Sequence, residues 1–379
     1  MHEQAATLAP VEDTGPSPAR LHLAVSTAPE PTSELTTVRR LTQDLRHASS
    51  RRYLADVIGS AAIGWGAFAL AAWSAWPIAA RVLCVAVASA MIYRALMFIH
   101  ELCHQPGLRI VRHVWHAILG VPALVPLLLY QPLHQHHHSA DTYGTREDGE
   151  YEQLRGRCRR MALRLLLLNF AFPLAMLLRF GLLGPLGWLL PVVRREVLPR
   201  FGHLSMRLPF EAPRLRGAAA AEAARIDVVC TLWAWVLTAG LFTPAATAVW
   251  TWAAVLVGVA TLNTFRALGC THLYVEQAEG RNALAQVTDS VNVDSGGPLT
   301  RLFCPIGLRF HALHHLAPYL PYHALAEAHR RLLRGLPLSS PYRQANVPSL
   351  WQGWRRLVRA TDTCEENTGR RVSRDAASA

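Results

Sequence analysis

The residues best able to do chemistry are histidines, and they are concentrated in one short stretch. Residues 133–145 read LHQHHHSADTYGT and hold four histidines within five positions. If the stretch forms a helix, His134 shares one face with His137 and His138, which follow at the third and fourth positions. Three imidazoles on one face are typical of a metal site, although a solvated polar run has the same composition. Histidines elsewhere in the chain must decide between the two.

Two further clusters supply matching histidines. HELCH places two histidines four residues apart, and HALHH late in the chain repeats the HxxHH spacing of the first stretch. Eight imidazoles are too many for one tetrahedral zinc ion, which takes about four ligands. They suit two metal ions with open positions, and nitrogen-rich sites suit iron, zinc and copper. The eight candidate ligands are His100, His104, His134, His137, His138, His311, His314 and His315.

Two other functions remain open at this point. HELCH also matches HExxH, the zinc-protease motif, in which Glu101 would be the general base. A protease would leave both HxxHH clusters without a role, because its third ligand is a single residue. A histidine-rich metal transporter is the other alternative. Its ligands should lie within the spans, near the middle of the membrane, whereas these clusters lie at the ends of spans.

The composition is that of a membrane protein. Of the 379 residues, 51% are hydrophobic and only 17% are charged, and the apolar residues form long runs. The net charge of +12 is carried almost wholly by arginines beside these runs, as expected of cytoplasmic flanks. No phosphate-binding loop or aromatic-rich basic stripe points to a nucleic-acid partner. The seven cysteines form no CxxC pair, which favours reduced thiols over a zinc ribbon or disulfides.

Four apolar runs can cross the membrane as two hairpins. The first begins too late to be a signal peptide. Two other apolar segments, 110–130 and 161–193, contain prolines and charged residues, and we expect both to be interfacial or re-entrant. This topology places every histidine cluster and both termini on the cytoplasmic side. The expected spans are 57–76, 82–99, 226–242 and 246–263.

The remaining segments lie outside the spans. Residues 1–32 lack aromatic residues and are rich in Ala, Pro, Thr and Glu, which predicts a disordered tail. Residues 33–56 start with apolar residues at helical spacing among arginines, which predicts an amphipathic surface helix, on the membrane or in solvent. We assign 57–335 to one membrane domain and 336–379 to a cytoplasmic C-terminal tail.

Three stretches resemble the membrane fatty acid desaturase family, the integral-membrane di-iron desaturases and hydroxylases with three histidine boxes, and in particular its bacterial members. The resemblance covers roughly residues 50–335. It implies an all-α membrane fold of four transmembrane helices in two hairpins, with a cytoplasmic helical cap that carries the boxes. The matching stretches are HELCH at 100–104, HQHHHSADTYGTREDGEY at 134–151 and DSVNVDSGGPLTRLFCPIGLRFHALHHLAPYLPYHALAEAHRRL at 289–332.

The resemblance also implies roles for single residues. The eight box histidines would ligate two iron ions, with His272 in RALGCTHLY as a further ligand just after the last span. His136 would face away from the metals. Asp148 and Glu150 would form an exposed acidic turn, with a hydrogen bond to a ligand imidazole as the alternative. Four other histidines match no box. His113 and His116 would lie at the membrane interface, and His323 and His329 would lie on the surface or would contact the ligand imidazoles.

The implied activity is O2-dependent desaturation of a fatty acyl chain. Two irons would bind O2 as co-substrate and, with two external electrons, convert a methylene pair into a double bond. Hydroxylation is the close alternative, because the boxes do not distinguish the two outcomes. The sequence contains no HPGG cytochrome b5 motif and no cysteine cluster. The electrons must therefore come from a separate ferredoxin, rubredoxin or cytochrome b5-like donor.

The expected location is the bacterial inner membrane. The acyl chain of the lipid would enter an apolar tunnel between the spans and the cap. A basic cytoplasmic surface could meet an acidic redox partner or anionic lipid headgroups. The arginines of that surface are Arg330, Arg331, Arg334, Arg355 and Arg356.

Overall fold

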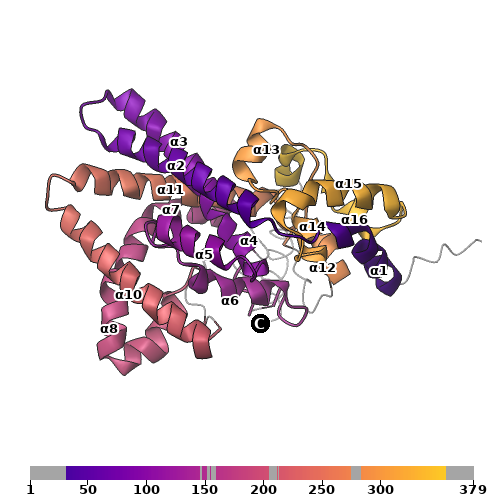
Figure 1. The fold of residues 1–379 in the computed structure, drawn as a ribbon, viewed down its shortest axis with the longest axis horizontal. Helices are drawn as coiled ribbons and strands as arrows, with labels where there is room; N and C mark the ends of the chain where they lie inside the picture. Colours follow the sequence, from indigo (N-terminus) through magenta and orange to yellow (C-terminus); the bar gives the residue numbers. More distant parts are fainter. Residues whose placement is uncertain are drawn as a thin grey trace, which may run out of the picture.

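Within the described residues, the chain folds into helices and one pair of two-residue parallel strands. In this computed structural model the described residues are 31–145, 147–151, 154, 159–204, 211, 213–274 and 283–355. The predicted disordered tail therefore lies almost wholly outside the described residues, and the C-terminal tail is described only as far as residue 355. Figure 1 shows long helices on one side of the molecule and a group of short helices on the other.

Five helices of the described chain are long and apolar enough to cross a membrane, by length and composition. Their outward faces carry large exposed side chains such as Ile63, Leu167 and Trp250. Lipid would cover these side chains in a bilayer. The five helices are Ser50–Ala72, Ile78–His104, Ala162–Leu189, Gly217–Gly240 and Ala246–Gly269.

The first two of these helices form the first predicted hairpin. α2 (Ser50–Ala72) is followed by α3 (Ile78–Leu96), which continues through a turn at residue 97 into α4 (Phe98–His104). Arg94, near the end of α3, donates from Nη2 to Asp56 Oδ1 of α2 at 3.0 Å. This ion pair offsets the cost of a charge beside the apolar helices. The first histidine cluster is thus an extension of a spanning helix.

The second predicted hairpin consists of α10 (Gly217–Gly240) and α11 (Ala246–Gly269). α11 packs closely on α3 at Gly258, where a Cβ atom would collide with the side chain of Ser89. Ser89 Oγ instead donates to the carbonyl of Val255 at 3.3 Å. The missing side chain at Gly258 therefore sets the spacing between the two hairpins.

Most of the segment 161–193 forms one continuous helix, Ala162–Leu189, although its prolines and charged residues suggest a break. Arg179 is buried within it, and its Nη2 donates to Asp227 of α10 at 3.1 Å. A π-helical turn accommodates this arginine, so the helix continues where the sequence suggests a break. The segment and its continuation comprise α7 (Arg159–Leu178), η4 (Arg179–Leu183), α8 (Gly184–Leu189), η5 (Val193–Val197) and α9 (Leu198–Phe201).

The segment 110–130 does not form one long helix. The chain turns at Pro122, whose carbonyl accepts hydrogen bonds from Trp233 Nε1 of α10 (3.1 Å) and Trp252 Nε1 of α11 (2.8 Å). These bonds fix the start of α6, and with it the second histidine cluster, against the second hairpin. The elements are α5 (Arg109–Trp115), the π-helical turn η2 (His116–Gly120) and α6 (Leu127–His138).

The C-terminal part, residues 283–347, forms a second apolar core that we call the cap. Leu313 of one helix and Leu332 of another are fully buried in this core. The two strands of the cap pair in parallel, with Asn292 opposite Asn346. The elements are α12 (Ala283–Asp289), β1 (Asn292–Val293), α13 (Pro298–Phe303), α14 (His311–Leu316), η6 (Tyr322–Ala324), α15 (Leu325–Gly335), α16 (Pro341–Gln344) and β2 (Asn346–Val347).

The single helix predicted over 33–56 is two helices. α1 (Pro31–Thr42) and η1 (Gln43–Leu45) end before α2 begins. Val38 of α1 is buried in the core of the cap, beside α15. Glu34 Oε1 accepts a hydrogen bond from Ser340 Oγ at 2.6 Å. The apolar stripe of α1 is therefore covered by the cap, and not by a membrane surface or solvent.

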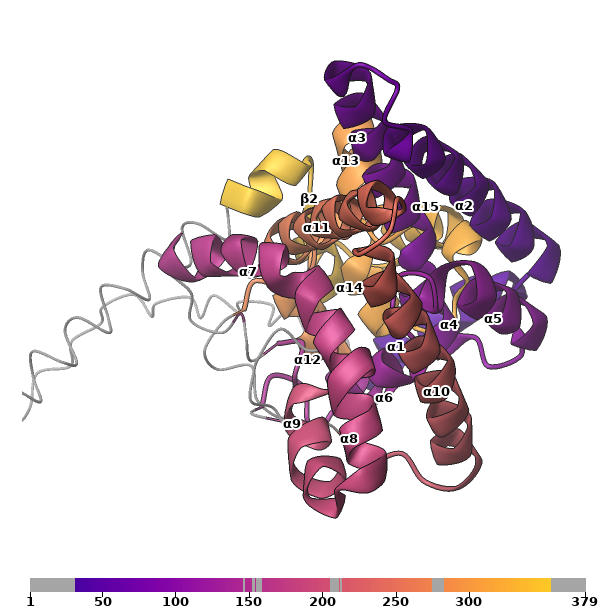
Figure 2. The same cartoon turned by 90° about the vertical axis from the view of Figure 1, so that its left-hand side faces the viewer.

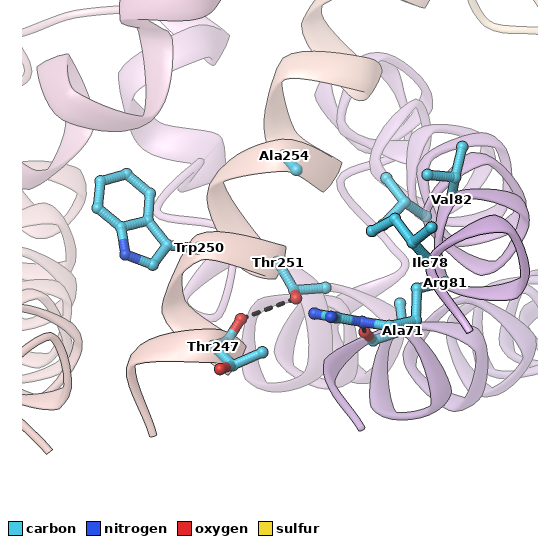
Figure 3. Close-up of a pocket in the computed structure, with 9 residues that line it drawn as sticks. Ala71, Ile78, Arg81, Val82, Thr247, Trp250, Thr251 and Ala254 are labelled. Carbon is cyan, nitrogen blue, oxygen red and sulfur yellow. Dashed lines mark hydrogen bonds between the residues drawn. The ribbon is translucent and has the colours of Figure 1, made fainter. Parts of the chain in front are cut away.

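A groove of about 470 Å³ lies between the first hairpin and α11. Figure 3 shows its walls, with Ile78 and Arg81 on one side and Thr251 and Ala254 of α11 on the other. At about 1.5 Å per residue, the helix from Arg81 to His100 spans roughly 28 Å. The groove is therefore remote from the histidine clusters.

Replacing Gly258 with leucine should destabilise the protein by about 1–3 kcal/mol, because the new side chain forces α3 and α11 apart. Thermal unfolding of the detergent-solubilised protein measures this effect. Gly66→Leu is the matched control, since a Cβ atom at that helical glycine meets nothing within 4 Å. Equal unfolding temperatures for the two variants would show that α3 and α11 do not pack closely at Gly258.

Candidate metal centre

Four segments bring all nine predicted histidines into one cluster. α4 carries the first box, α6 the second and α14 the third. His272 follows α11 and is held by an isolated β-bridge to Ser290. Seven of the nine side chains are buried, while His104 and His138 are partly exposed. The i, i+3 and i+4 spacings put the histidines of each helix on the face that meets the others.

Half of the cluster is a group of four imidazoles that we call group one. One ring nitrogen from each of its four imidazoles lies within 4.8 Å of those of the other three. His104 Nε2 and His134 Nε2 are 2.8 Å apart, and His100 Nε2 is buried without any hydrogen-bond partner. Group one contains His100, His104, His134 and His314.

The other half is a second group of four, which we call group two. All four of its side chains are buried, and the same 4.8 Å limit holds for its nitrogens. His272 Nε2 is 3.0 Å from His137 Nε2 and 2.9 Å from His311 Nε2. The ring nitrogens of each group thus converge on one point. Group two contains His137, His272, His311 and His315.

His138 belongs to neither group and lies between them. Its Nε2 is 3.1 Å from His314 Nε2 of group one, and its ring stacks on His315 of group two with centroids 4.3 Å apart. The ninth imidazole therefore borders both positions.

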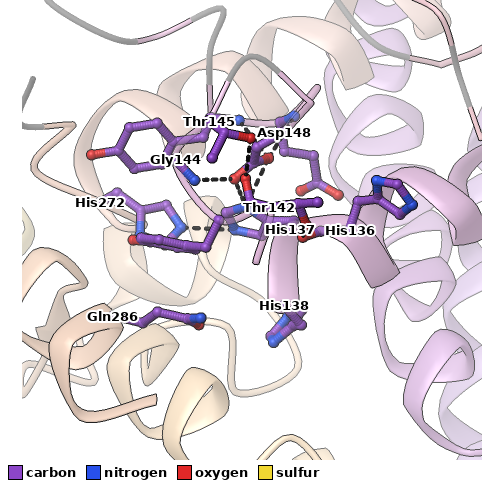
Figure 4. Close-up of polar contacts among 12 residues, drawn as sticks. His136, His137, His138, Thr142, Gly144, Thr145, Asp148, His272 and Gln286 are labelled. Carbon is purple, nitrogen blue, oxygen red and sulfur yellow. Dashed lines mark hydrogen bonds and ion pairs between the residues drawn. The ribbon is translucent and has the colours of Figure 1, made fainter. Parts of the chain in front are cut away.

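Two carboxylates hold the imidazoles of α6 from behind. His134 Nδ1 donates to Glu150 Oε1 at 2.9 Å, and His137 Nδ1 donates to Asp148 Oδ2 at 2.9 Å. Asp148 is fully buried and also accepts backbone N–H groups, including that of Gly144 at 3.0 Å, as Figure 4 shows. The prediction of an exposed acidic turn is therefore wrong for Asp148, and the alternative of a hydrogen bond to an imidazole is confirmed for both acids.

Neutral acceptors orient two imidazoles of group two in the same way. His272 Nδ1 lies 3.0 Å from the hydroxyl of Tyr143, which itself donates to Asp289 Oδ2 at 2.8 Å. His315 Nδ1 donates to Gln286 Oε1 at 3.0 Å. A proton held on Nδ1 leaves the lone pair of Nε2 free, which is the tautomer that a metal requires. Neither Tyr143 nor Gln286 was predicted from the sequence, because no motif marks them.

Burial sets the protonation of these imidazoles. Desolvation, together with neighbouring imidazoles, lowers the pKa of His272, His311 and His315 well below the usual value. They are therefore neutral at neutral pH. Burial also lowers the pKa of His137, but the charge and hydrogen bond of Asp148, together with the charges of Glu150 and Asp289, outweigh it and the net pKa is raised. A metal cation bound at His137 Nε2 would replace the proton there and would interact favourably with the negative charge of Asp148.

The cluster fits two metal ions. Burying a neutral imidazole costs free energy when its inward lone pair has no partner, and a metal cation that binds this lone pair removes the cost. Within the described part of the chain, His100 Nε2 has no hydrogen-bond partner, as expected of a nitrogen that ligates a metal ion. Two sets of four nitrogens suit iron, and also zinc or copper, by donor type.

The carboxylate of Glu101 is not placed to act as a protease base. Its Oε2 accepts a hydrogen bond from Tyr53 OH at 2.6 Å and from the backbone N–H of Tyr322 at 2.9 Å. These bonds tie α4 to α2 and to the cap. The histidines of HELCH, moreover, share group one with histidines from two other boxes.

The other histidines lie outside both groups. Figure 4 shows His136 projecting away from His137 and His138. His329 is buried in the cap, between Asp294 (3.0 Å) and Tyr342 (2.6 Å). Three others also lie outside the groups. His113 is exposed, and His323 accepts a hydrogen bond from the backbone N–H of Ser49. His116, which was predicted to be interfacial, is buried and has no hydrogen-bond partner among the described residues.

Comparison with known proteins gives two matches. A model of the family described as fatty acid desaturase matches residues 72–346, a range that contains all nine histidines. A protein of Caulobacter vibrioides (strain NA1000 / CB15N) named ceramide hydroxylase is 35% identical to the chain over 333 residues. The match covers 84% of this chain and 91% of that protein.

His137→Ala should lose most of the iron of group two, because one of four converging nitrogens is removed. His136→Ala is the matched control and should keep its iron, since that imidazole points elsewhere. Metal analysis of the purified proteins compares the two. Equal iron contents would mean that group two does not bind metal through His137.

Asp148→Asn should weaken iron binding by about 10–100-fold, the usual effect of removing the partner that orients a ligand imidazole. The substitution keeps the size of the side chain but removes the charge behind His137. Iron release to a chelator reports the change. Asp141→Asn, at an exposed acid of the same loop, should release iron as the unaltered protein does.

Proposed function

The chain belongs to the fatty acid desaturase family, and we propose that it is a membrane di-iron hydroxylase that acts on a ceramide-like lipid. Members of this family are integral-membrane oxidoreductases with a di-iron centre. The observation that carries the proposal is the 35% identity, over most of both chains, to a protein named ceramide hydroxylase. It favours the hydroxylation alternative over the desaturation expected from the sequence.

Groups one and two are the proposed ligands of two iron ions, with His138 beside both. When bound, the di-iron centre would supply the reduction of O2 with two external electrons. Hydroxylation then balances as R–CH2–R′ + O2 + 2e⁻ + 2H⁺ → R–CHOH–R′ + H2O. The chain's own part is to hold the irons, to orient their imidazoles through Asp148 and Glu150, and to keep bulk water from the buried cluster.

The proposed orientation places the cap and both termini on the cytoplasmic side of a bacterial inner membrane. The arginine-rich flanks of the long helices support it. The helix Ala162–Leu189 is long enough to be a fifth span, yet four spans keep all histidine boxes on one side. Ala162–Leu189 would then lie in the interface or re-enter the membrane.

The proposed electron donor is a separate ferredoxin, rubredoxin or cytochrome b5-like protein. Arg334 on the surface of the cap supports an acidic partner. Two neighbours contribute less free charge, because Arg330 and Arg331 each pair with Glu327, at 2.6 and 2.9 Å. Arg356 lies outside the described residues.

Desaturation is the second candidate, because the matching family model carries that description. Its balance differs in the product: –CH2–CH2– + O2 + 2e⁻ + 2H⁺ → –CH=CH– + 2H2O. Hydroxylation adds one oxygen atom to the lipid, and desaturation removes two hydrogen atoms. Mass spectrometry of lipids therefore separates the two.

Cells that express the chain should accumulate ceramides or related lipids with one added oxygen atom. The product should fall to background in His314→Ala, which removes a nitrogen of group one. Lipids that lose two hydrogens instead would establish the desaturase. A lipid profile that is the same with and without the chain would contradict both candidates.

A further inference from the structure

A small pocket lies directly beside both histidine groups. Its cavity of about 80 Å³ is bordered by His100 of group one and by three histidines of group two. Apolar side chains form part of its wall, together with the charged and amide groups of Arg266, Glu150 and Asn263. The pocket is lined by His100, Tyr130, Leu133, His137, Gly149, Glu150, Leu154, Leu204, Asn263, Arg266, Ala267, Thr271, His272, Tyr274 and His311.

Arg266 is the unusual member of this wall. It lies in the last turn of α11 and is only 9% exposed. Its Nε and Nη2 both donate to Asn263 Oδ1 at 3.1 Å, which uses two of its five N–H donors. No carboxylate of the described chain forms an ion pair with it. A buried guanidinium is costly unless its N–H donors find acceptors.

Acceptors and donors face each other across the same pocket. Glu150, whose side chain is 24% exposed, presents a carboxylate already held by His134 and Tyr130. The Asn263 amide is oriented by its two bonds from Arg266. A small group that carries both a carbonyl oxygen and an N–H or hydroxyl would satisfy Arg266 on one side and Glu150 on the other.

We propose that this pocket binds the polar head of the lipid substrate, an amide with a neighbouring hydroxyl, and that Arg266 and Asn263 recognise it. The inference rests on the proposed hydroxylase function and adds the position of attack. Because the head lies beside the metal ligands, the methylene that is oxidised lies within a few bonds of the head and not in the middle of the acyl chain.

The charged groups in the wall argue against a mid-chain methylene in this pocket, and its size limits the occupant to a few atoms. A volume of about 80 Å³ holds only a few heavy atoms, since one water molecule alone occupies about 30 Å³. Sites for whole ligands of drug size measure about 300–1,000 Å³. An acyl chain laid against Arg266 and Glu150 would also remove water from two charged groups without offering either a hydrogen bond.

The test uses the purified iron-loaded protein with a redox donor system and two lipids. One is a ceramide, and the other is a long-chain alkane of equal length that lacks the carbonyl, N–H and hydroxyl groups. Arg266→Met should raise the KM for the ceramide at least about tenfold while its iron content and its KM for the alkane stay unchanged. Arg266→Lys, which keeps the charge, should recover part of the affinity.

Arg301→Met is the control, because this arginine is exposed on α13, away from the pocket, and should leave both KM values unchanged. Asn263→Leu provides a second variant if Arg266→Met does not fold, and it should raise the ceramide KM in the same direction. Mass spectrometry of fragments should place the new hydroxyl near the amide.

A hydroxyl in the middle of the acyl chain, or an unchanged ceramide KM in a folded Arg266 or Asn263 variant, would overturn the inference but leave the hydroxylase standing. Absence of any hydroxylated product from the unaltered, iron-loaded protein would overturn the proposed function itself, and this inference with it.

Discussion

The structure depends on nine imidazoles that are packed against one another with their Nε2 atoms inward. Such a cluster is unfavourable on its own, because buried lone pairs that face each other lack donors. Asp148, Glu150, Tyr143 and Gln286 fix the Nδ1 protons of four of these imidazoles on the outside, so that the inward Nε2 atom of each of the four carries the lone pair. The surrounding helices hold the imidazoles in this arrangement although it costs free energy, and bound cations would offset that cost.

The long helices determine where that cluster lies. α4 is the continuation of a spanning helix, so its position is set by the packing of α3 on α2 and α11. Pro122 fixes the entry to α6 by accepting hydrogen bonds from tryptophans of both helices in the second hairpin. The three-way contact of Glu101 with Tyr53 and Tyr322 then joins α4 to the cap, which supplies the third box.

The sequence was sufficient to predict that the eight box histidines belong together, because their spacings place them on common helix faces, whereas His272 was predicted from the family resemblance. The structure brings all nine together. The sequence also predicted the long apolar helices α2, α3, α10 and α11. It did not predict the continuous helix over 162–189, since the π-helical turn that accommodates Arg179 depends on a partner, Asp227, about 50 residues away. The burial of Asp148 was missed for a similar reason. A turn that follows a histidine box can point outward or inward, and only the packing of Tyr143 and Tyr151 around it decides.

The wide separation of the histidine boxes along the chain has a consequence for biosynthesis. Group one needs His104 and His314, and ribosomes add roughly 5–20 residues per second, so about 10–40 s pass between the synthesis of the two. α1 waits longer for its partner, α15, because about 290 residues separate the two. The first hairpin must therefore remain in the membrane with an incomplete half-site of imidazoles. The complete cluster, and with it the proposed iron site, forms only after translation has passed the third box.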